Sequence, residues 1–377
     1  MHRSGLALLL AAVAAALIGA QASYADDAQG HGNGNSGVVF VQTNQISGNA
    51  IVVYDRADDG TLSQAGTYAT RGNGSAALPG TESDRLASQG SLVFDREHKQ
   101  LIAVNAGSDT VSAFRVKGDR LELEEVLSSG GQFPASVGVH DDLAYVLNSG
   151  GTGIVQGFRI NQHGLEPISG SARSLGLANT NPPNFLAAPG QVGFTPDGSK
   201  LIVTTKASTS SIDVFQVDED GQLSSVPVAN QSATPVPFAF TFGPAGRLVA
   251  GEAGASSVTT YRIGQDGTLA DPKSQTDGQV ALCWIQRVGR LYFVSNTGSN
   301  TVSAFRIGSD GQPSLVNSVA AITNTGPIDL TSSGDFLYVE TGLTSTVDEF
   351  HVGHDGALVP IGTVTGLPPG IEGIAGS

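Results

Sequence analysis

The sequence predicts an all-β fold, a seven-bladed β-propeller with four-stranded blades, on three observations. The first is a repeated unit, clearest at Leu291–Gly311: an apolar run, an Asn/Gly/Ser turn, an alternating run and a tight turn. The second is the number of copies, and the third is the way the two ends of the chain complement each other. A single hairpin of this kind cannot bury its apolar face, so copies must pack together.

One aromatic residue in the second strand of each hairpin marks the copies, and in six of seven a turn glycine follows six residues later. These anchors are Tyr54, Phe114, Phe158, Phe215, Tyr261, Phe305 and Phe350. By subtraction they lie 60, 44, 57, 46, 44 and 45 residues apart, with insertions around 72–89 and 172–190 in the two long gaps. Apolar runs before and after each hairpin raise the count to four strands per unit, which is typical of propeller blades.

The ends of the repeat region predict how the ring closes. Val38–Asn44 has the character of a second strand, and no inner strand precedes it. A leftover apolar run, Ile371–Ala375, follows the last strand of the final unit. We therefore expect this run to supply the inner strand of the first blade, which leaves no large open sheet edge. The propeller is accordingly placed at 38–377.

The first 25 residues have the features of a cleaved signal peptide. A short positive start precedes the apolar stretch Leu6–Ala20, which is too short for a confident transmembrane helix, and both Ala20–Ala22 and Ser23–Ala25 are small-residue cleavage sites. The signal peptide is placed at 1–25, and residues 26–37 form a polar, Gly/Asn-rich linker. A secreted or periplasmic protein without a membrane span is expected.

The composition narrows the classes of partner. The formal charge of −15, from 34 acidic and 19 basic residues, argues against nucleic-acid binding, which needs clustered Lys and Arg. The His residues and the single Cys283 have no zinc-ligand spacing, so no metal and no cofactor is predicted. Cys283 cannot form an internal disulfide and is expected to be a small buried residue. The expected partner is a small molecule, a lactone or a sugar-like ligand, and the expected state is a monomer.

Several units resemble the blades of the lactonase-type seven-bladed propellers, notably LIAVNAGSDTVSAFRV, AYVLNSGGTGIVQGFRI and LYFVSNTGSNTVSAFRIGSDGQ. That family includes a bacterial 6-phosphogluconolactonase and fungal enzymes of the muconate-cycloisomerase type. The resemblance extends from about Val38 to the C-terminus. It implies a lactonase-like hydrolase that acts on a small lactone or cyclic ester at the mouth of the central channel.

The resemblance also implies catalytic His, Arg and Glu residues in the central cleft, and here the sequence departs from it. His98, His140, His163 and His354 fall in turns on the face away from the predicted mouth. Ser136 stands where a histidine of the family would be expected, near the start of an inner strand. The departure favours an alternative, a non-catalytic propeller that binds a sugar, a glycan or a protein surface.

Propeller topology decides which residues surround the mouth, because loops between strands two and three share a face with the loops between blades. The end of strand two is polar in every unit: Asn44, Asn105, Asn148, Lys206, Glu252, Asn296, and Glu340 or Thr341. Repeated Asn residues are either turn formers or a polar ring that binds a ligand. Asn105, Asn148 and Asn296 are the candidates for ligand binding. With Glu252 they also offer oxygen ligands for a divalent cation, a less favoured alternative.

The two departures from asparagine, Lys206 and Glu252, lie in neighbouring units. They either form an ion pair between blades or act together in catalysis. In the second case the Glu252 carboxylate serves as general base toward water and the Lys206 ammonium stabilises an oxyanion, as lactone hydrolysis requires. Glu252 and Lys206 are therefore the candidate catalytic residues.

The inner strands and the loops before them supply the remaining mouth residues. These are Gln89, Ser91, Ser136, Gln191, Trp284, Asp329 and Glu372. The amides of Gln89 and Gln191 either bind the ligand or cap channel water. Gln89, Ser136, Gln191 and Glu372 complete the set of candidate ligand-binding residues. The insertion at Leu78–Leu86 is expected to bring Glu82, Asp84 and Arg85 to the same face.

Overall fold

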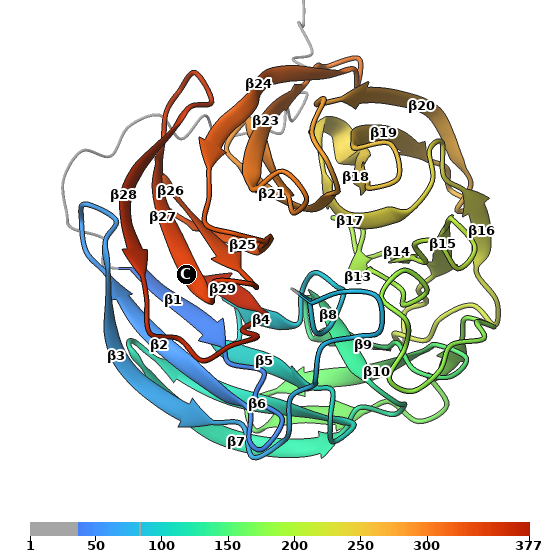
Figure 1. Cartoon of the computed structure of the whole chain (residues 1–377). Helices are drawn as coiled ribbons and strands as arrows, with labels where there is room; N and C mark the ends of the chain where they lie inside the picture. Colours follow the sequence, from blue (N-terminus) through green and yellow to red (C-terminus); the bar gives the residue numbers. More distant parts are fainter. Residues whose placement is uncertain (1–36, 83) are drawn as a thin grey trace, which may run out of the picture. The chain divides into compact units, whose positions relative to one another are not determined.

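The computed structural model describes residues 37–82 and 84–377, in which the strands form seven antiparallel sheets arranged around a central channel (Figure 1). The predicted seven-bladed β-propeller is confirmed. The first strand begins at Gly37, one residue before the predicted start of the propeller. The predicted signal peptide and the rest of the predicted linker lie outside the described residues.

From the channel outward, the first three blades are as follows. Blade 1 contains β29 (Ile374–Gly376), β1 (Gly37–Gln42), β2 (Ala50–Arg56) and β3 (Leu62–Ala69). Blade 2 contains β4 (Leu92–Asp95), β5 (Gln100–Asn105), β6 (Thr110–Lys117) and β7 (Arg120–Ser128). Blade 3 contains β8 (Pro134–His140), β9 (Leu143–Asn148), β10 (Ile154–Asn161) and β11 (Gly164–Pro167), and the short β12 (Arg173–Ser174) also pairs with β10.

The other four blades follow the same order. Blade 4 contains β13 (Gln191–Phe194), β14 (Lys200–Thr204), β15 (Ser211–Gln216) and β16 (Val228–Gln231). Blade 5 contains β17 (Pro237–Phe242), β18 (Leu248–Glu252), β19 (Ser257–Ile263) and β20 (Leu269–Thr276), with the 3-10 turn η1 (Pro244–Gly246) after β17. Blade 6 contains β21 (Leu282–Val288), β22 (Leu291–Asn296), β23 (Thr301–Ile307) and β24 (Pro313–Ile322). Blade 7 contains β25 (Pro327–Ser333), β26 (Phe336–Thr341), β27 (Thr346–Val352) and β28 (Leu358–Val364).

The C-terminal strand closes the ring in the predicted way. β29 pairs with β1 in antiparallel register, with Phe40 opposite Ala375 and Val41 opposite Ile374. The strand starts three residues later than the predicted Ile371, because Glu372 and Gly373 both bond to the backbone of Gln42 and their pairing with β1 is irregular. Gly373 has a φ of +116°, a conformation that L side chains rarely adopt.

The burial of each strand follows its place in the blade. Second strands such as β5, β22 and β26 are buried along their whole length, because neighbouring blades cover both of their faces. This explains their continuous apolar sequences. Outer strands such as β3 alternate between half-buried and exposed residues, since one face is open to solvent. The core therefore lies between blades, near the channel.

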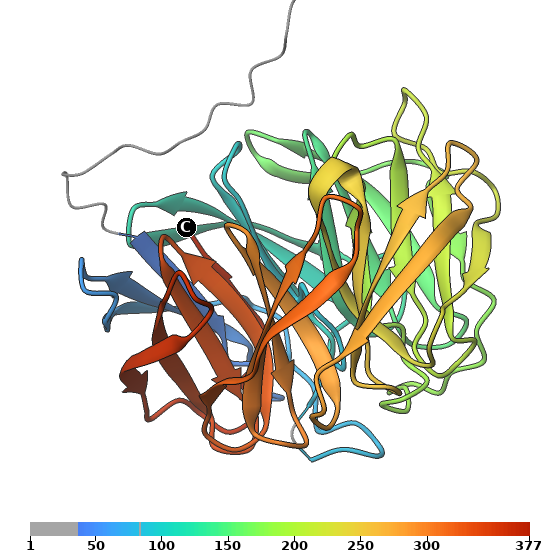
Figure 2. The same ribbon diagram turned by 90° about the horizontal axis from the view of Figure 1, so that it is seen from above.

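The segment that joins β3 to β4 contains the first long insertion. It crosses the centre of the ring in Figure 1 and projects from one side of the ring in Figure 2, where it is drawn in light blue. Among the residues that the structure describes, no helix is long and apolar enough to cross a membrane.

Candidate functional site

Residues 84–90, here called the plug, lie between the inner strands and contact several blades. The Lys206 ammonium of blade 4 donates a hydrogen bond to the carbonyl of Ala87 at 2.6 Å. The Trp284 indole N–H of blade 6 donates to the carbonyl of Ser88 at 2.9 Å. The Ser88 hydroxyl in turn donates to the carbonyl of Ala135 at 2.6 Å, in blade 3. The plug is thereby held from three sides of the channel.

The side-chain amides of Gln89 and Gln191 form hydrogen bonds with backbone groups of inner strands. The Gln89 amide donates to the Ile285 carbonyl at 3.0 Å and accepts the Ile285 N–H at 2.9 Å. Gln191 Oε1 accepts the N–H of Phe240 at 2.7 Å. Ile285 and Phe240 follow irregularities in the pairing of β21 and β17, which free backbone groups from the ladder. Both glutamines therefore use these atoms to complete the hydrogen bonding of the inner strands, and contact of either one with ligand or water stays a prediction.

Ser136 and the plug are joined in the same manner. The Ser136 hydroxyl donates to the Gln89 carbonyl at 2.6 Å and accepts the N–H of Val192 at 3.2 Å. Ser136 is fully buried. Its contacts link blades 3 and 4 to the plug, so the structure gives this residue a bridging position and no opening toward a ligand.

Lys206 is fully buried in a left-handed turn after β14, with a φ of +48°. Its Nζ lies 5.0 Å from the ring centroid of Phe185 and 4.7 Å from that of Phe238. Burial lowers the pKa of Lys206 to about 8, and the negative charge of Asp84 opposes this shift. The two ring faces stabilise the ammonium by cation–π attraction where water is excluded.

Asp84 and Glu372 form a buried carboxyl pair beside Lys206. Asp84 Oδ1 accepts the N–H groups of Leu86 at 3.2 Å and Ala87 at 2.5 Å, and Glu372 Oε2 accepts those of Arg85 at 2.6 Å and Leu86 at 2.8 Å. Asp84 Oδ2 and Glu372 Oε1 have no N–H or O–H donor among the described residues. The two carboxyls hydrogen-bond to each other, which requires one of them to hold a proton.

Burial raises the pKa of both carboxyls of the pair. Burial, followed by the charge of Asp84, raises the pKa of Glu372 well above its usual range. Burial raises the pKa of Asp84 too, but a hydrogen bond from Glu372 and the charge of Lys206 act in the opposite direction. The pair thus shares a proton beside the Lys206 ammonium, whose charge favours an ionised carboxylate at Asp84.

Lys206 and Asp84 line a cavity of about 310 Å³ on the mouth face, here called the mouth pocket. Most of its walls are apolar or aromatic. The lining residues are Gly80, Thr81, Asp84, Phe185, Leu186, Lys206, Val236, Phe238, Ala253, Gly254, Ala281, Cys283, Trp284, Thr297 and Gly298. Blades 4, 5 and 6 supply one part of the wall, and the two long insertions supply the other. The predicted burial of Cys283 is confirmed, and burial raises the pKa of its thiol to about 12.

Glu252 does not face Lys206, although their backbones are close. The Lys206 N–H donates to the carbonyl of Pro237, which lies opposite Glu252 in the pairing of β17 with β18. Glu252 Oε2 accepts hydrogen bonds from the hydroxyls of Thr234 at 2.6 Å and Thr259 at 2.5 Å, and Oε1 accepts one from Tyr261. Both oxygens of the carboxylate thus accept hydrogen bonds from hydroxyl groups of blade 5 and the segment before it. Its surroundings support neither the ion pair nor the base role that we assigned to it.

Asn105, Asn148 and Asn296 form hydrogen bonds next to the turns between strands two and three. Asn105 Nδ2 donates to Ser112 at 2.8 Å, and its Oδ1 accepts from Asn49 of the neighbouring blade at 3.0 Å. Asn296 repeats the first contact with Ser303 at 2.8 Å, and Asn148 donates to the Ser129 carbonyl at 3.0 Å. All three are fully buried. Their contacts fit the turn interpretation and place none of them among the mouth-pocket residues.

Of the candidate residues, the structure brings Lys206 and Glu372 together, with Asp84 between them. Phe185 and Phe238, which contact Lys206, were missed by sequence reasoning. The length of the second insertion was a usable signal for Phe185, because long loops over a channel mouth often carry binding residues. Nothing in the local sequence of Phe238 distinguishes it from a core residue.

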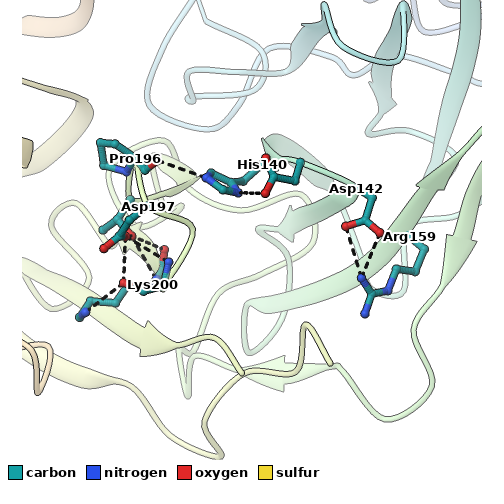
Figure 3. Close-up of polar contacts among 9 residues, drawn as sticks. His140, Asp142, Arg159, Pro196, Asp197 and Lys200 are labelled. Atoms are coloured by element: carbon teal, nitrogen blue, oxygen red, sulfur yellow. Dashed lines mark hydrogen bonds and ion pairs between the residues drawn. The ribbon is translucent and has the colours of Figure 1, made fainter. Parts of the chain in front are cut away.

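The described histidines in the turns of the blades lie as expected, away from the mouth. His140 lies at the end of β8 next to Pro196 of blade 4 (Figure 3). Its Nε2 is 3.2 Å from the Pro196 carbonyl, and its Nδ1 is 3.4 Å from the Asp141 carboxylate. Nearby, Arg159 pairs with Asp142 at 3.3 Å. The contact between His140 and Pro196 joins the far-side turns of blades 3 and 4. His140 therefore has a structural role in this place.

The fold and the mouth pocket define a β-propeller with a mainly apolar cavity on its mouth face. A sequence model described as lactonase, 7-bladed β-propeller, matches residues 17–286. Because this match covers more than half of the chain, the protein belongs to the lactonase seven-bladed β-propeller family, as the blade sequences indicated. No curated protein matches the chain.

Solved structures of similar fold cover almost the whole propeller. A protein from Lactobacillus plantarum has a TM-score of 0.71 at 17% identity, over 91% of this chain and 99% of that one. A proposed 6-phosphogluconolactonase from Bacteroides fragilis has a TM-score of 0.69 at 18% identity, over 91% and 98%. The periplasmic gluconolactonase of Pseudomonas aeruginosa has a TM-score of 0.69 at 16% identity, over 89% and 98%. At such low identities the likeness concerns the fold alone.

Proposed function

We propose that the protein is a secreted or periplasmic lactonase that hydrolyses a small lactone or cyclic ester in the mouth pocket. The observation that carries the proposal is the meeting of an ammonium and a proton-sharing carboxyl pair at the wall of an apolar pocket. Family membership and the gluconolactonase and 6-phosphogluconolactonase descriptions of similar structures support the reaction class. The periplasmic location of one of them agrees with the signal-peptide features of the N-terminal sequence.

In this mechanism Asp84 acts as the general base. Its ionised carboxylate accepts a proton from a water molecule while the water oxygen attacks the lactone carbonyl carbon. The Lys206 ammonium, now bound to the Ala87 carbonyl, redirects a hydrogen bond to the oxygen that becomes negative. A buried ammonium stabilises a negative oxygen strongly, because water does not screen the attraction between the two charges.

The carboxyl pair also supplies the proton for the second half of the reaction. After the attack, Asp84 and Glu372 hold two protons between them. One of these moves to the ring oxygen as the carbon–oxygen bond of the ring breaks, which leaves a hydroxy acid and restores the single shared proton. The acid then loses its own proton to solvent. Lys206 keeps the role predicted for it, while the base role passes from Glu252 to Asp84.

The alternative is a propeller that binds a small molecule without transforming it. It is favoured by the lack of any His or Arg among the described residues that line the mouth pocket. It is also favoured by the bonds that already occupy Lys206 and Asp84 Oδ1. Under this alternative the pocket is the binding site, and the carboxyl pair stabilises the plug.

Hydrolysis of a lactone panel by the purified protein tests the proposal, with aldonolactones, homoserine lactones, muconolactones and alkyl lactones as substrates. Asp84→Asn should lower kcat about 100-fold or more, and Lys206→Met should lower it by a similar factor. Glu82→Gln removes an exposed carboxylate from the same insertion and should leave kcat unchanged. A protein that binds a lactone but turns over none would establish the alternative. Activity that survives Asp84→Asn would contradict the proposed base.

A further inference from the structure

We infer that the mouth pocket selects a lactone with an apolar body, an alkyl or aromatic group that carries one carbonyl, and rejects polyhydroxylated sugar lactones. This inference rests on the proposed function and adds the class of substrate. The first observation is the aromatic wall formed by Phe185, Phe238 and Trp284, of which the two phenylalanine rings contact the Lys206 ammonium. Such a wall offers flat apolar area and few hydrogen bonds.

The polar groups of the pocket are the second observation, because most of them already have partners in the protein. The Trp284 N–H donates to Ser88, and the Thr297 hydroxyl donates to the carbonyl of Pro327 at 2.8 Å. Lys206 donates to Ala87, and Asp84 Oδ1 accepts from two backbone N–H groups. A sugar lactone would bring several hydroxyls into this pocket, and each hydroxyl without a partner is costly to desolvate. A single carbonyl needs only the Lys206 donor.

The rim of the pocket is the third observation, since the apolar surface continues outward from it. Leu186 lines the pocket and is 49% exposed. Val280 is 60% exposed and packs over Gly298, whose added Cβ would lie 2.7 Å from Val280 Cγ1. Exposed apolar side chains beside the pocket favour a ligand that extends an alkyl group out of it.

Binding can be measured apart from catalysis because Trp284 is the single tryptophan of the chain. It lies in the pocket wall, 1% exposed, with its ring centroid 4.7 Å from that of Phe238. A ligand in the pocket should therefore change the whole tryptophan emission. Lactams resist hydrolysis at neutral pH and keep the ring and carbonyl of the lactone. Their titration therefore measures affinity alone.

The experiment titrates the full chain with two six-membered lactams, one with a pentyl chain and one with the hydroxyls of gluconolactone. The pentyl lactam should bind at least about 30-fold more tightly, since each buried methylene contributes a factor of about four. Val280→Ser should weaken pentyl-lactam binding about threefold. Val359→Ser changes a similarly exposed valine of β28, far along the chain from the rim, and should have no effect.

The outcomes separate this inference from the proposed function. Equal or tighter binding of the hydroxylated lactam would overturn the inference, and hydrolysis of gluconolactone with no binding of the pentyl lactam would overturn it while the lactonase proposal stands. Binding of the pentyl lactam with no hydrolysis of any lactone would support the inferred ligand class and overturn the hydrolysis. If neither lactam binds, the mouth pocket is not the site and the inference fails.

Discussion

The side-chain amide of Gln89 pairs with the backbone of Ile285 much as a neighbouring strand would. Its Nε2 donates to the Ile285 carbonyl at 3.0 Å, and its Oε1 accepts the Ile285 N–H at 2.9 Å. The two residues are 196 positions apart in sequence. One amide thereby links the plug to the inner strand of blade 6, at a place where the pairing of β21 with β22 is irregular.

We expect Gln89→Ala to lower the free energy of unfolding by about 2–4 kcal/mol, because it leaves a buried N–H and a buried C=O of Ile285 without partners. Urea denaturation followed by circular dichroism measures this loss. Gln64→Ala, on the exposed part of β3, is the matched control and should change stability by less than about 0.5 kcal/mol. Equal stability of the two variants would mean that the Gln89 contact contributes nothing.

The fold could be predicted from the sequence because the features that determine it are local and repeated. Each blade shows the same apolar strands and turn residues, and the register of the hairpins follows from them. The closing run was recognisable because it remained after the seventh unit. Its start was misplaced by three residues, since the pairing before Ile374 is irregular where the Glu372 side chain bonds to the plug.

The site was less predictable, because it depends on which way side chains turn at strand ends. Lys206 was identified as a departure from the repeat, and it does line the mouth pocket. Glu252 departs from the repeat just as clearly, but it turns toward Tyr261 inside its own blade. Asp84 was assigned to the correct face, yet its contact with Glu372 joins two distant parts of the chain that no local pattern connects.

The pH dependence of stability should reveal the buried Lys206. Its pKa is about 8 in the folded protein and 10.5 by its usual value, so the unfolded chain binds more protons between these pH values. Stability therefore rises with pH across this window, by at most about 3 kcal/mol at 1.36 kcal/mol per pKa unit. The difference in stability between wild type and Lys206→Met should thus shift in favour of the wild type from pH 8 to pH 10.

Comparing the two proteins at each pH removes an opposing effect. The Cys283 thiol has a raised pKa and makes the folded protein less stable as pH rises above 9. It is present in both proteins, and the loss of the Lys206 charge raises its pKa further in Lys206→Met, which adds to the expected difference. Thermal or urea unfolding at four or five pH values is sufficient. Parallel profiles for wild type and Lys206→Met would refute the lowered pKa of Lys206.

The contribution of Asp329 to stability should change with pH in the opposite direction and in a lower pH range. Burial, reinforced by the charge of Asp84, raises the pKa of Asp329 from 3.8 to about 7. The stability that this group contributes is present below about pH 4 and is lost as pH rises through 7. Asp329→Asn keeps the acceptor for the Leu330 N–H and should be more stable than the wild type at pH 8, by about 2–4 kcal/mol.

The matched control for Asp329 is another aspartate whose pKa moves the other way. Hydrogen bonds from Thr195 and Ser199 lower the pKa of Asp197 to about 2, so its charge does not change between pH 5 and pH 8. Over this interval Asp197→Asn should follow the wild-type profile in parallel, whereas Asp329→Asn should diverge from it. If both variants ran parallel to the wild type, Asp329 would be ionised throughout.

Removal of residues 374–377 should show how far the ring depends on its closure. The deletion removes all of β29, exposes the inner edge of β1 and uncovers apolar surface that Ile374 and Ala375 now bury, while Glu372 remains. Exposed strand edges pair with other chains, so we expect aggregation on heating and a loss of at least about 4 kcal/mol. Differential scanning calorimetry and limited proteolysis measure both effects.

Two point variants serve as comparisons for the deletion. Ala375→Pro, which cannot extend the ladder, should reproduce the loss. Ser377→Ala should cost about 1 kcal/mol, because it removes the hydrogen bond from the Val38 N–H to the Ser377 hydroxyl. A truncated protein that unfolds at the wild-type temperature would mean that packing between blades, and not the C-terminal strand, holds the ring closed.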